Sequence, residues 1–184
     1  MKTKLPYEII ENIFTYIDLH IVIDALYYTG YRELVHFLYK KYKSRINYIN
    51  AASHGHVNIM RYLKEHTDII CNDSAIISAI KNGHLNTTIW LYLNIPRCRK
   101  RNLLDHAASN GHLDIIIWLN RKSEVMCSVD AMDFAAGNGH LHVLKWFQEN
   151  RTEGYSDFAK QLARFNGYPE VLQWLSENKS KRIL

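Results

Sequence analysis

The feature that most constrains this chain is a sequence element that recurs every 28 residues. Glycine occurs at five equally spaced positions, each followed by a ring-bearing residue: Gly55-His56, Gly83-His84, Gly111-His112, Gly139-His140 and Gly167-Tyr168. Each glycine is preceded at a fixed distance by alanine: Ala51, Ala79, Ala107, Ala135 and Ala163. Each is followed at a fixed distance by a large aromatic residue: Tyr62, Trp90, Trp118, Trp146 and Trp174. This pattern predicts stacked units that bury a continuous core only together.

Each unit is predicted to contain two short helices joined by a tight turn. Before the glycine, apolar residues such as Leu104, Ala107 and Ala108 recur at helical spacing. After it, Ile115 and Ile116 belong to a second apolar face. Four of the glycines follow asparagine, and Asn-Gly is typical of a helix end at which glycine adopts the left-handed conformation. We expect the small alanine to let neighbouring backbones approach and the aromatic residue to fill space between units.

The segment 105–116, Asp-His-Ala-Ala-Ser-Asn-Gly-His-Leu-Asp-Ile-Ile, resembles the central pattern of ankyrin repeats. The resemblance covers residues 46–178. It differs in length, because an ankyrin unit has about 33 residues, and the usual Thr-Pro-Leu-His opening is absent. The resemblance implies an all-α, ankyrin-like helix-turn-helix repeat solenoid with shortened inter-repeat loops, for example at 94–101 and 122–129. Compact units of this kind resemble those of protists and large DNA viruses.

The ends of the array differ from its middle. Residues 19–45 contain a degenerate first repeat, whose Gly30 is 25 rather than 28 residues before Gly55. Residues 46–184 contain the five regular repeats. In the last of them Lys160 and Arg164 replace core-like residues, which is typical of a C-terminal cap whose outer face meets water.

Two interpretations of residues 1–18 stay open. The run from Leu5 to Phe14, Leu-Pro-Tyr-Glu-Ile-Ile-Glu-Asn-Ile-Phe, resembles the opening of an F-box. The resemblance implies docking on the adaptor subunit of a cullin-RING ubiquitin ligase, with the repeats recruiting the substrate. The docking residues would be Leu5, Pro6, Ile9, Ile10, Ile13 and Phe14. The alternative is an amphipathic capping helix that covers the apolar end of the first repeat.

The recurring histidines do not predict a metal site. Equivalent positions in stacked helices lie about 8–10 Å apart, whereas zinc-bound imidazoles each approach the metal to about 2 Å. We expect each imidazole to form a hydrogen bond at the turn between helices instead. Cys71 and Cys127 have the same loop position two units apart, beyond the roughly 7 Å limit for a disulfide. The three cysteines form no CxxC pair and are expected to be reduced thiols.

The sequence contains no HExxH, no GxSxG and no phosphate-binding glycine loop, so we expect neither enzymatic activity nor a cofactor. Twenty-three Lys and Arg against 18 Asp and Glu give a net charge of +5. The basic loop at 97–101 and the basic run at 40–45 are predicted to be solvated, because neither forms a continuous stripe with stacking aromatic residues. Weak electrostatic binding of RNA or DNA through these loops is a secondary alternative.

The composition also constrains the compartment. No apolar run approaches the roughly 20 residues that a membrane-spanning helix needs, and the first residues do not resemble a secretory signal. We expect a monomer in the cytoplasm or nucleus, or in the host cytoplasm if the chain is viral. The function predicted is that of a non-enzymatic protein–protein interaction scaffold whose partner the sequence does not identify. The predicted contact residues are Ser53, Lys81, Arg97, Arg99, Arg101, Asp105, Ser109 and Asn138.

Overall fold

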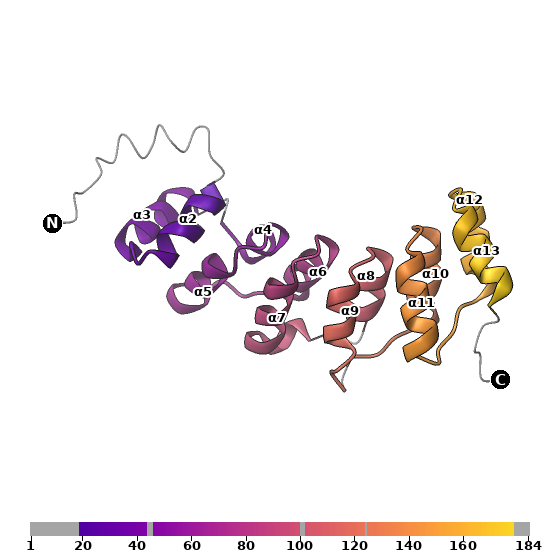
Figure 1. Cartoon of the computed structure of the whole chain (residues 1–184). Coiled ribbons are helices and arrows are strands. Elements are labelled where there is room, and N and C mark those ends of the chain that lie inside the picture. The colour runs from indigo at the N-terminus through magenta and orange to yellow at the C-terminus, as the bar shows by residue number, and fades with distance from the viewer. Residues whose placement is uncertain (1–18, 44–45, 100–101, 124, 179–184) are drawn as a thin grey trace.

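The computed structural model describes residues 19–43, 46–99, 102–123 and 125–178, which form an elongated array of helix pairs (Figure 1). The first pair is α2 (Leu19–Tyr28) and α3 (Arg32–Tyr42). The following pairs are α4 (Tyr48–Ser53) with α5 (Val57–His66), α6 (Asp73–Lys81) with α7 (Leu85–Asn94), α8 (Leu103–Ser109) with α9 (Leu113–Leu119), α10 (Val129–Gly137) with α11 (Leu141–Asn150), and α12 (Asp157–Phe165) with α13 (Pro169–Glu177). A 3₁₀ turn, η1 (Pro96–Cys98), follows α7, and none of these described residues forms a strand.

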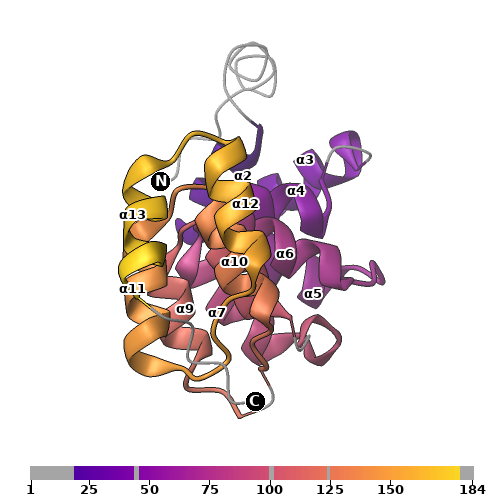
Figure 2. The same cartoon turned by 90° about the vertical axis from the view of Figure 1, so that its right-hand side faces the viewer.

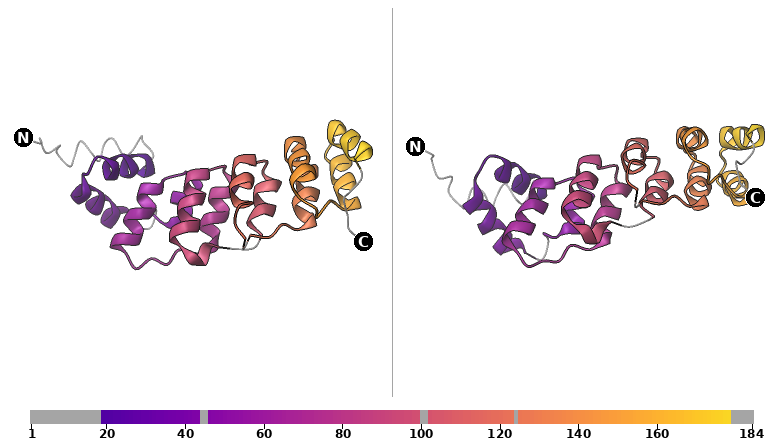
Figure 3. Two further views of the ribbon diagram at one scale, coloured as in Figure 1. Left: turned by 60° about the horizontal axis from the view of Figure 1, so that its bottom comes forward. Right: turned by 90° about the horizontal axis from the view of Figure 1, so that it is seen from below.

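We call the first helix of each pair the inner helix and the second the outer helix. From α4 onward, each inner helix packs closely along the inner helix of the next pair, while the outer helices contact one another more sparsely. The last two pairs, seen along the array, show these two layers clearly (Figure 2). The first and last helix pairs lie at opposite ends of the array in both views of Figure 3. The all-α repeat solenoid predicted from the sequence is thereby confirmed.

The turn inside each pair closes on a left-handed glycine. The φ angles of the glycines in these turns lie between 74° and 82°: Gly30, Gly55, Gly83, Gly111, Gly139 and Gly167. In the fourth repeat, His140 N donates to Ala135 O over 2.9 Å and Gly139 N donates to Ala136 O over 3.2 Å. These two bonds satisfy carbonyl groups that the end of α10 would otherwise leave unpaired. The predicted helix end at each Asn-Gly is therefore correct.

The five recurring alanines have no exposed surface, and each lies on an inner helix that packs along a neighbouring inner helix: Ala51, Ala79, Ala107, Ala135 and Ala163. Trp90 is buried, and the tryptophans of the later repeats are partly buried against the same core. The ring of Trp118 packs edge-on against Tyr92 of the preceding outer helix, with 5.3 Å between ring centroids. Aromatic packing therefore links successive repeats, as the sequence predicted.

The first pair joins the array in a different way from the others. The helices α2 and α3 form a helix-turn-helix, but α2 packs against the outer helix α5. The Asp24 carboxylate accepts hydrogen bonds from the backbone N and the side-chain Nδ2 of Asn58, over 3.0 and 3.2 Å. Asp24 thereby satisfies an otherwise unpaired amide in the first turn of α5.

Candidate functional site

Histidine side chains connect each repeat to the one before it. The Nε2 atoms of His84, His112 and His140 lie 2.9, 3.1 and 3.2 Å from backbone carbonyl oxygens near the end of the preceding inner helix. Because a carbonyl only accepts, Nε2 carries the proton in each case. The accepting residues are Ser53, Lys81 and Ser109. The expected role of these rings as hydrogen-bonding groups at the turns is confirmed, and each bond also joins two repeats.

A second link between repeats uses a carboxylate on one inner helix and the serine that begins the next. Asp105 accepts from Ser128 N over 3.1 Å and from Ser128 Oγ over 2.9 Å. Asp133, which is only 3% exposed, accepts from Ser156 N over 2.8 Å and from Ser156 Oγ. Each serine is also the N-cap of its own helix, donating to a carboxylate while accepting from the backbone two residues later. These contacts fix the inner helices relative to one another.

One face of the inner helices remains uncovered in the part of the chain that the structure describes. Apolar side chains on this face are substantially exposed: Ile49 at 39%, Phe134 at 42% and Phe158 at 47%. By the helical period, exposed Lys81 and half-buried His106 lie on the same face of their inner helices as these apolar residues. We call these five residues, together with Ser78, the inner-helix surface. It is a mixed polar and aromatic face that several repeats contribute side by side.

The predicted contact residues fall into groups with different surroundings. Lys81, Arg97, Arg99 and Asn138 are exposed, and Ser53, Asp105 and Ser109 are half-buried. Asp105 forms the inter-repeat bonds to Ser128, and Asn138 Nδ2 donates to Ser109 O over 2.8 Å. The side chains of Asp105 and Asn138 therefore already help join repeats. Their contact with a partner stays a prediction.

The two described arginines of the basic loop after α7 have different surroundings. Arg99 Nε donates to Tyr92 O over 2.9 Å, and its guanidinium lies 5.4 Å from the centre of the Tyr92 ring. Arg97 makes no such contact and lines a pocket. Arg101 lies outside the described residues, as do the F-box-like residues Leu5, Pro6, Ile9, Ile10, Ile13 and Phe14.

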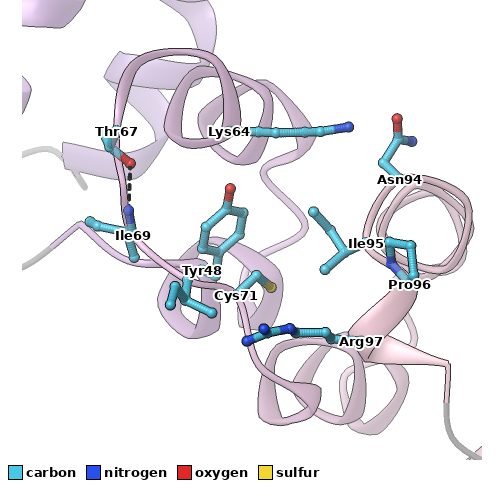
Figure 4. A pocket seen from close by; sticks show the side chains of 10 residues that line it. Tyr48, Lys64, Thr67, Ile69, Cys71, Asn94, Ile95, Pro96 and Arg97 are labelled. Carbon is cyan, nitrogen blue, oxygen red and sulfur yellow. Dashed lines mark hydrogen bonds between the residues drawn. The ribbon is translucent and has the colours of Figure 1, made fainter.

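The pocket beside Arg97 is a feature that sequence reasoning missed. It lies where the second and third helix pairs meet, has a volume of about 280 Å³ and opens to solvent (Figure 4). We call it the loop pocket; its lining residues come from α4, the end of α5, the following loop and the segment after α7: Tyr48, Lys64, Thr67, Ile69, Ile70, Cys71, Asn94, Ile95, Pro96 and Arg97. No sequence motif joins these residues, because the pocket is assembled from short segments of two successive repeats.

Two thiols that are distant in the sequence meet beside this pocket. Cys71 Sγ lies 3.7 Å from Cys98 Sγ, and both thiols donate to Asn72 O, over 3.6 and 3.2 Å. The hydrogen bond to Cys98, burial and the nearby Cys98 charge raise the pKa of Cys71. All three cysteines are free, as expected from the sequence. The approach of Cys71 to Cys98 was not anticipated, because they occupy different positions in their repeats.

Among the described residues, no group of three or more His, Cys, Asp or Glu side chains could hold a metal ion. Over the same residues, every helix is too short or too polar to cross a bilayer.

Comparison with known proteins gives one finding about the family. Residues 49–133 match the family model described as ankyrin repeats in three copies. No curated protein matches the chain. The structure continues the same helix pairs beyond the matched segment, through α11, α12 and α13.

Proposed function

Since residues 49–133 consist of ankyrin repeats, we propose that this chain is a non-enzymatic scaffold that holds a protein partner on its inner-helix surface. Ankyrin repeats are generally protein–protein interaction modules, and the family is typically non-enzymatic. The observation that carries the proposal is the uncovered aromatic and aliphatic side chains on inner helices, above all Phe134 at 42% exposure. Partly exposed aromatic side chains among polar neighbours are frequent anchors of protein interfaces.

The rigidity of the array supports this role. Histidine and aspartate bonds between repeats fix the spacing of the inner helices before any partner arrives. A preorganised surface loses little conformational entropy on binding, so more of the contact free energy becomes affinity. Three free thiols fit a reducing cytoplasm or nucleus as the compartment.

The test compares proteins captured by the wild-type chain with those captured by two variants. The double variant Lys81→Glu/Phe134→Ala alters the inner-helix surface, and Lys145→Glu makes the same type of charge change on the exposed side of α11. Affinity purification with quantitative mass spectrometry should find a partner that wild type and Lys145→Glu retain and the double variant loses. Equal recovery by all three proteins would count against the proposal, provided that circular dichroism shows the same helical content.

A second candidate function is that of a substrate adaptor of a ubiquitin ligase, favoured by the F-box-like sequence between Leu5 and Phe14. The repeats would then select the protein to be ubiquitinated, so this role adds to the scaffold role. The variant Leu5→Ala/Pro6→Ala should lose co-purification with a cullin and its adaptor subunit while keeping the repeat partner. If wild type captures the repeat partner without any cullin, the adaptor role is wrong and the scaffold role is unaffected.

A further inference from the structure

The loop pocket differs from the inner-helix surface in position and in chemistry. It is lined by the end of α5, the loop that follows and the segment after α7, together with Tyr48 of α4. The volume of about 280 Å³ is slightly below the range of about 300–1,000 Å³ that is usual for small-molecule sites. A space of this size suits one side chain of a partner better than a complete cofactor.

The polar groups that are free at this pocket are mainly donors. Lys64 and Arg97 lie on opposite sides of the space in Figure 4, with Tyr48 between them. Within the described part of the chain, neither cation pairs with a carboxylate. No acidic residue lines the pocket, although Asp68 lies on the same loop. The local charge is therefore positive.

The hydroxyl of Tyr48 is a second and independent indication of a ligand. Tyr48 is only 4% exposed, yet no described residue accepts a hydrogen bond from its hydroxyl. Burial, with smaller contributions from Cys71 and Cys98, raises the pKa of Tyr48 to about 12, so the group keeps its proton and donates at neutral pH. By contrast, Thr67 Oγ1 in the same wall already donates to Leu63 O over 2.7 Å.

We propose that the loop pocket binds the carboxylate side chain of an aspartate or glutamate in a protein partner, between Lys64, Arg97 and the Tyr48 hydroxyl. An ionised carboxylate only accepts hydrogen bonds and has about four lone-pair positions, which fits a pocket lined by three donor groups and by apolar side chains. A phosphorylated side chain carries up to twice the charge and is typically recognised by a cluster of arginines, whereas this pocket has one.

The rim extends the contact beyond the charged group. Ile70 lines the pocket and is 72% exposed, and Pro96, another lining residue, is also exposed. A partner segment that inserts its acidic side chain would therefore cover an aliphatic residue at the same time. This site deepens the proposed scaffold function, on which it rests, by assigning it a partner of acidic and apolar character.

The experiment uses small probes, so that it does not depend on knowing the partner. The full chain, labelled with ¹⁵N and with ¹³C at isoleucine methyl groups, is titrated with N-acetyl-glutamate methylamide and with its neutral glutamine counterpart. The glutamate probe should give saturable shifts confined to the region of Ile69, Cys71 and Ile95. The glutamine probe should bind at least about tenfold more weakly, because it lacks the charge-assisted hydrogen bonds.

Three variants test the assignment of the donors. The variant Lys64→Ala/Arg97→Ala should lose the shifts, and Arg121→Ala/Lys145→Ala, with the same change in net charge at exposed positions elsewhere, should keep them. Tyr48→Phe should weaken binding at unchanged thermal stability, because its hydroxyl has no partner within the protein.

The proposal is overturned if the glutamine probe binds equally well, or if the shifts persist in Lys64→Ala/Arg97→Ala. Tighter binding of an N-acetyl-phosphoserine methylamide probe would overturn the assignment to a carboxylate. None of these results depends on capture through Lys81 and Phe134, so the scaffold proposal and the pocket proposal can fail separately.

Discussion

The imidazole of His140 occupies the space that a side chain at Gly111, in the preceding repeat, would need. A Cβ atom placed on Gly111 would lie 2.7 Å from Nδ1 and 2.8 Å from Cε1 of His140. The same ring donates from Nε2 to Ser109 O over 3.2 Å. Glycine is thus required at this turn for two reasons, namely its φ of 76° and the ring that lies against it.

Replacing this glycine should therefore cost more stability than the same replacement at the end of the array. Gly167 has a similar φ of 79°, but a Cβ atom there would meet nothing within 4 Å. We expect Gly167→Ala to lower the free energy of unfolding by about 1 kcal/mol, from the backbone alone. Gly111→Ala should lose roughly 2–3 kcal/mol, because it also displaces His140 from its hydrogen bond.

Urea unfolding followed by circular dichroism measures this difference as a shift in the transition midpoint. Equal losses in the two variants would mean that the imidazole moves aside without cost, and the second reason for glycine would be wrong.

Acidification should destabilise the array through two of its histidines. Burial lowers the pKa of His140 and outweighs the opposing hydrogen bond to Ser109, while His142 and His112 add smaller lowering effects through charge repulsion. Burial and Lys81 lower the pKa of His106, against the smaller effect of Asp105. Because these pKa values are lower in the folded chain, the unfolded chain binds the same protons at a higher pH than the folded chain does. Stability should therefore be constant above the unfolded value of about 6.5 and fall as the pH drops below it.

Thermal unfolding between pH 8 and pH 5 tests this expectation. His106→Gln/His140→Gln should lower stability at pH 8 but show a smaller decrease toward pH 5 than the wild type. An identical pH dependence in the two proteins would assign the effect to other groups.

The sequence predicted the repeats correctly because their determinants are local. An apolar period of a helix, an Asn-Gly end and a small alanine each act within one unit, so five copies of the signal reinforce one another. The sequence did not predict the second reason for glycine at this turn, which is the ring that lies against it. The ring at His140 approaches Gly111 from the next repeat, and only the stacking of units brings the two together.

The candidate site was less predictable for the same reason. Lys64 and Arg97 are 33 residues apart in the sequence, and neither belongs to a motif. Arg97 and Arg99 look equivalent in the sequence, but the structure places Arg99 on Tyr92 and Arg97 at the loop pocket. The sequence also did not predict that the Asp105 carboxylate accepts hydrogen bonds from Ser128; its contact with a partner stays a prediction. Such contacts depend on the register between repeats, which a single unit does not encode.

Removing the Asp133 carboxylate should loosen the last repeat selectively. Its two oxygens hold Ser156, the N-cap of α12, and the site is almost fully buried. Hydrogen bonds to charged acceptors contribute about 1.5–3 kcal/mol each, so Asp133→Ala should cost roughly 3 kcal/mol. Because stability in a repeat array is a sum of units and interfaces, the loss should concentrate in α12 and α13.

Hydrogen exchange measured by mass spectrometry reports the loss of stability separately for each segment of the chain. Exchange in α12 and α13 should accelerate far more than in α4 to α7, and the exposed control Glu149→Ala should change neither. Uniform acceleration along the array would show that the repeats unfold as one unit.

The thiols should react slowly in the folded chain even though they are free. Burial, together with the Glu153 and Asp105 carboxylates, raises the pKa of Cys127 to about 12. At pH 8 only about one Cys127 in 10⁴ is then a thiolate, the form that attacks a disulfide reagent. Cys71 also has a raised pKa, and Cys98 has no exposed surface.

Labelling with Ellman's reagent at pH 8 should therefore be slow in native protein and complete, at three thiols per chain, in guanidinium chloride. Raising the pH from 8 to 9 should increase the native rate about tenfold, because the thiolate fraction grows in proportion while the fold is kept. In Cys127→Ser the total after unfolding should fall to two. Rapid labelling of one thiol in native wild type at pH 8, absent from Cys127→Ser, would instead show that Cys127 reaches solvent as a thiolate, contrary to its burial against Glu153 and Asp105.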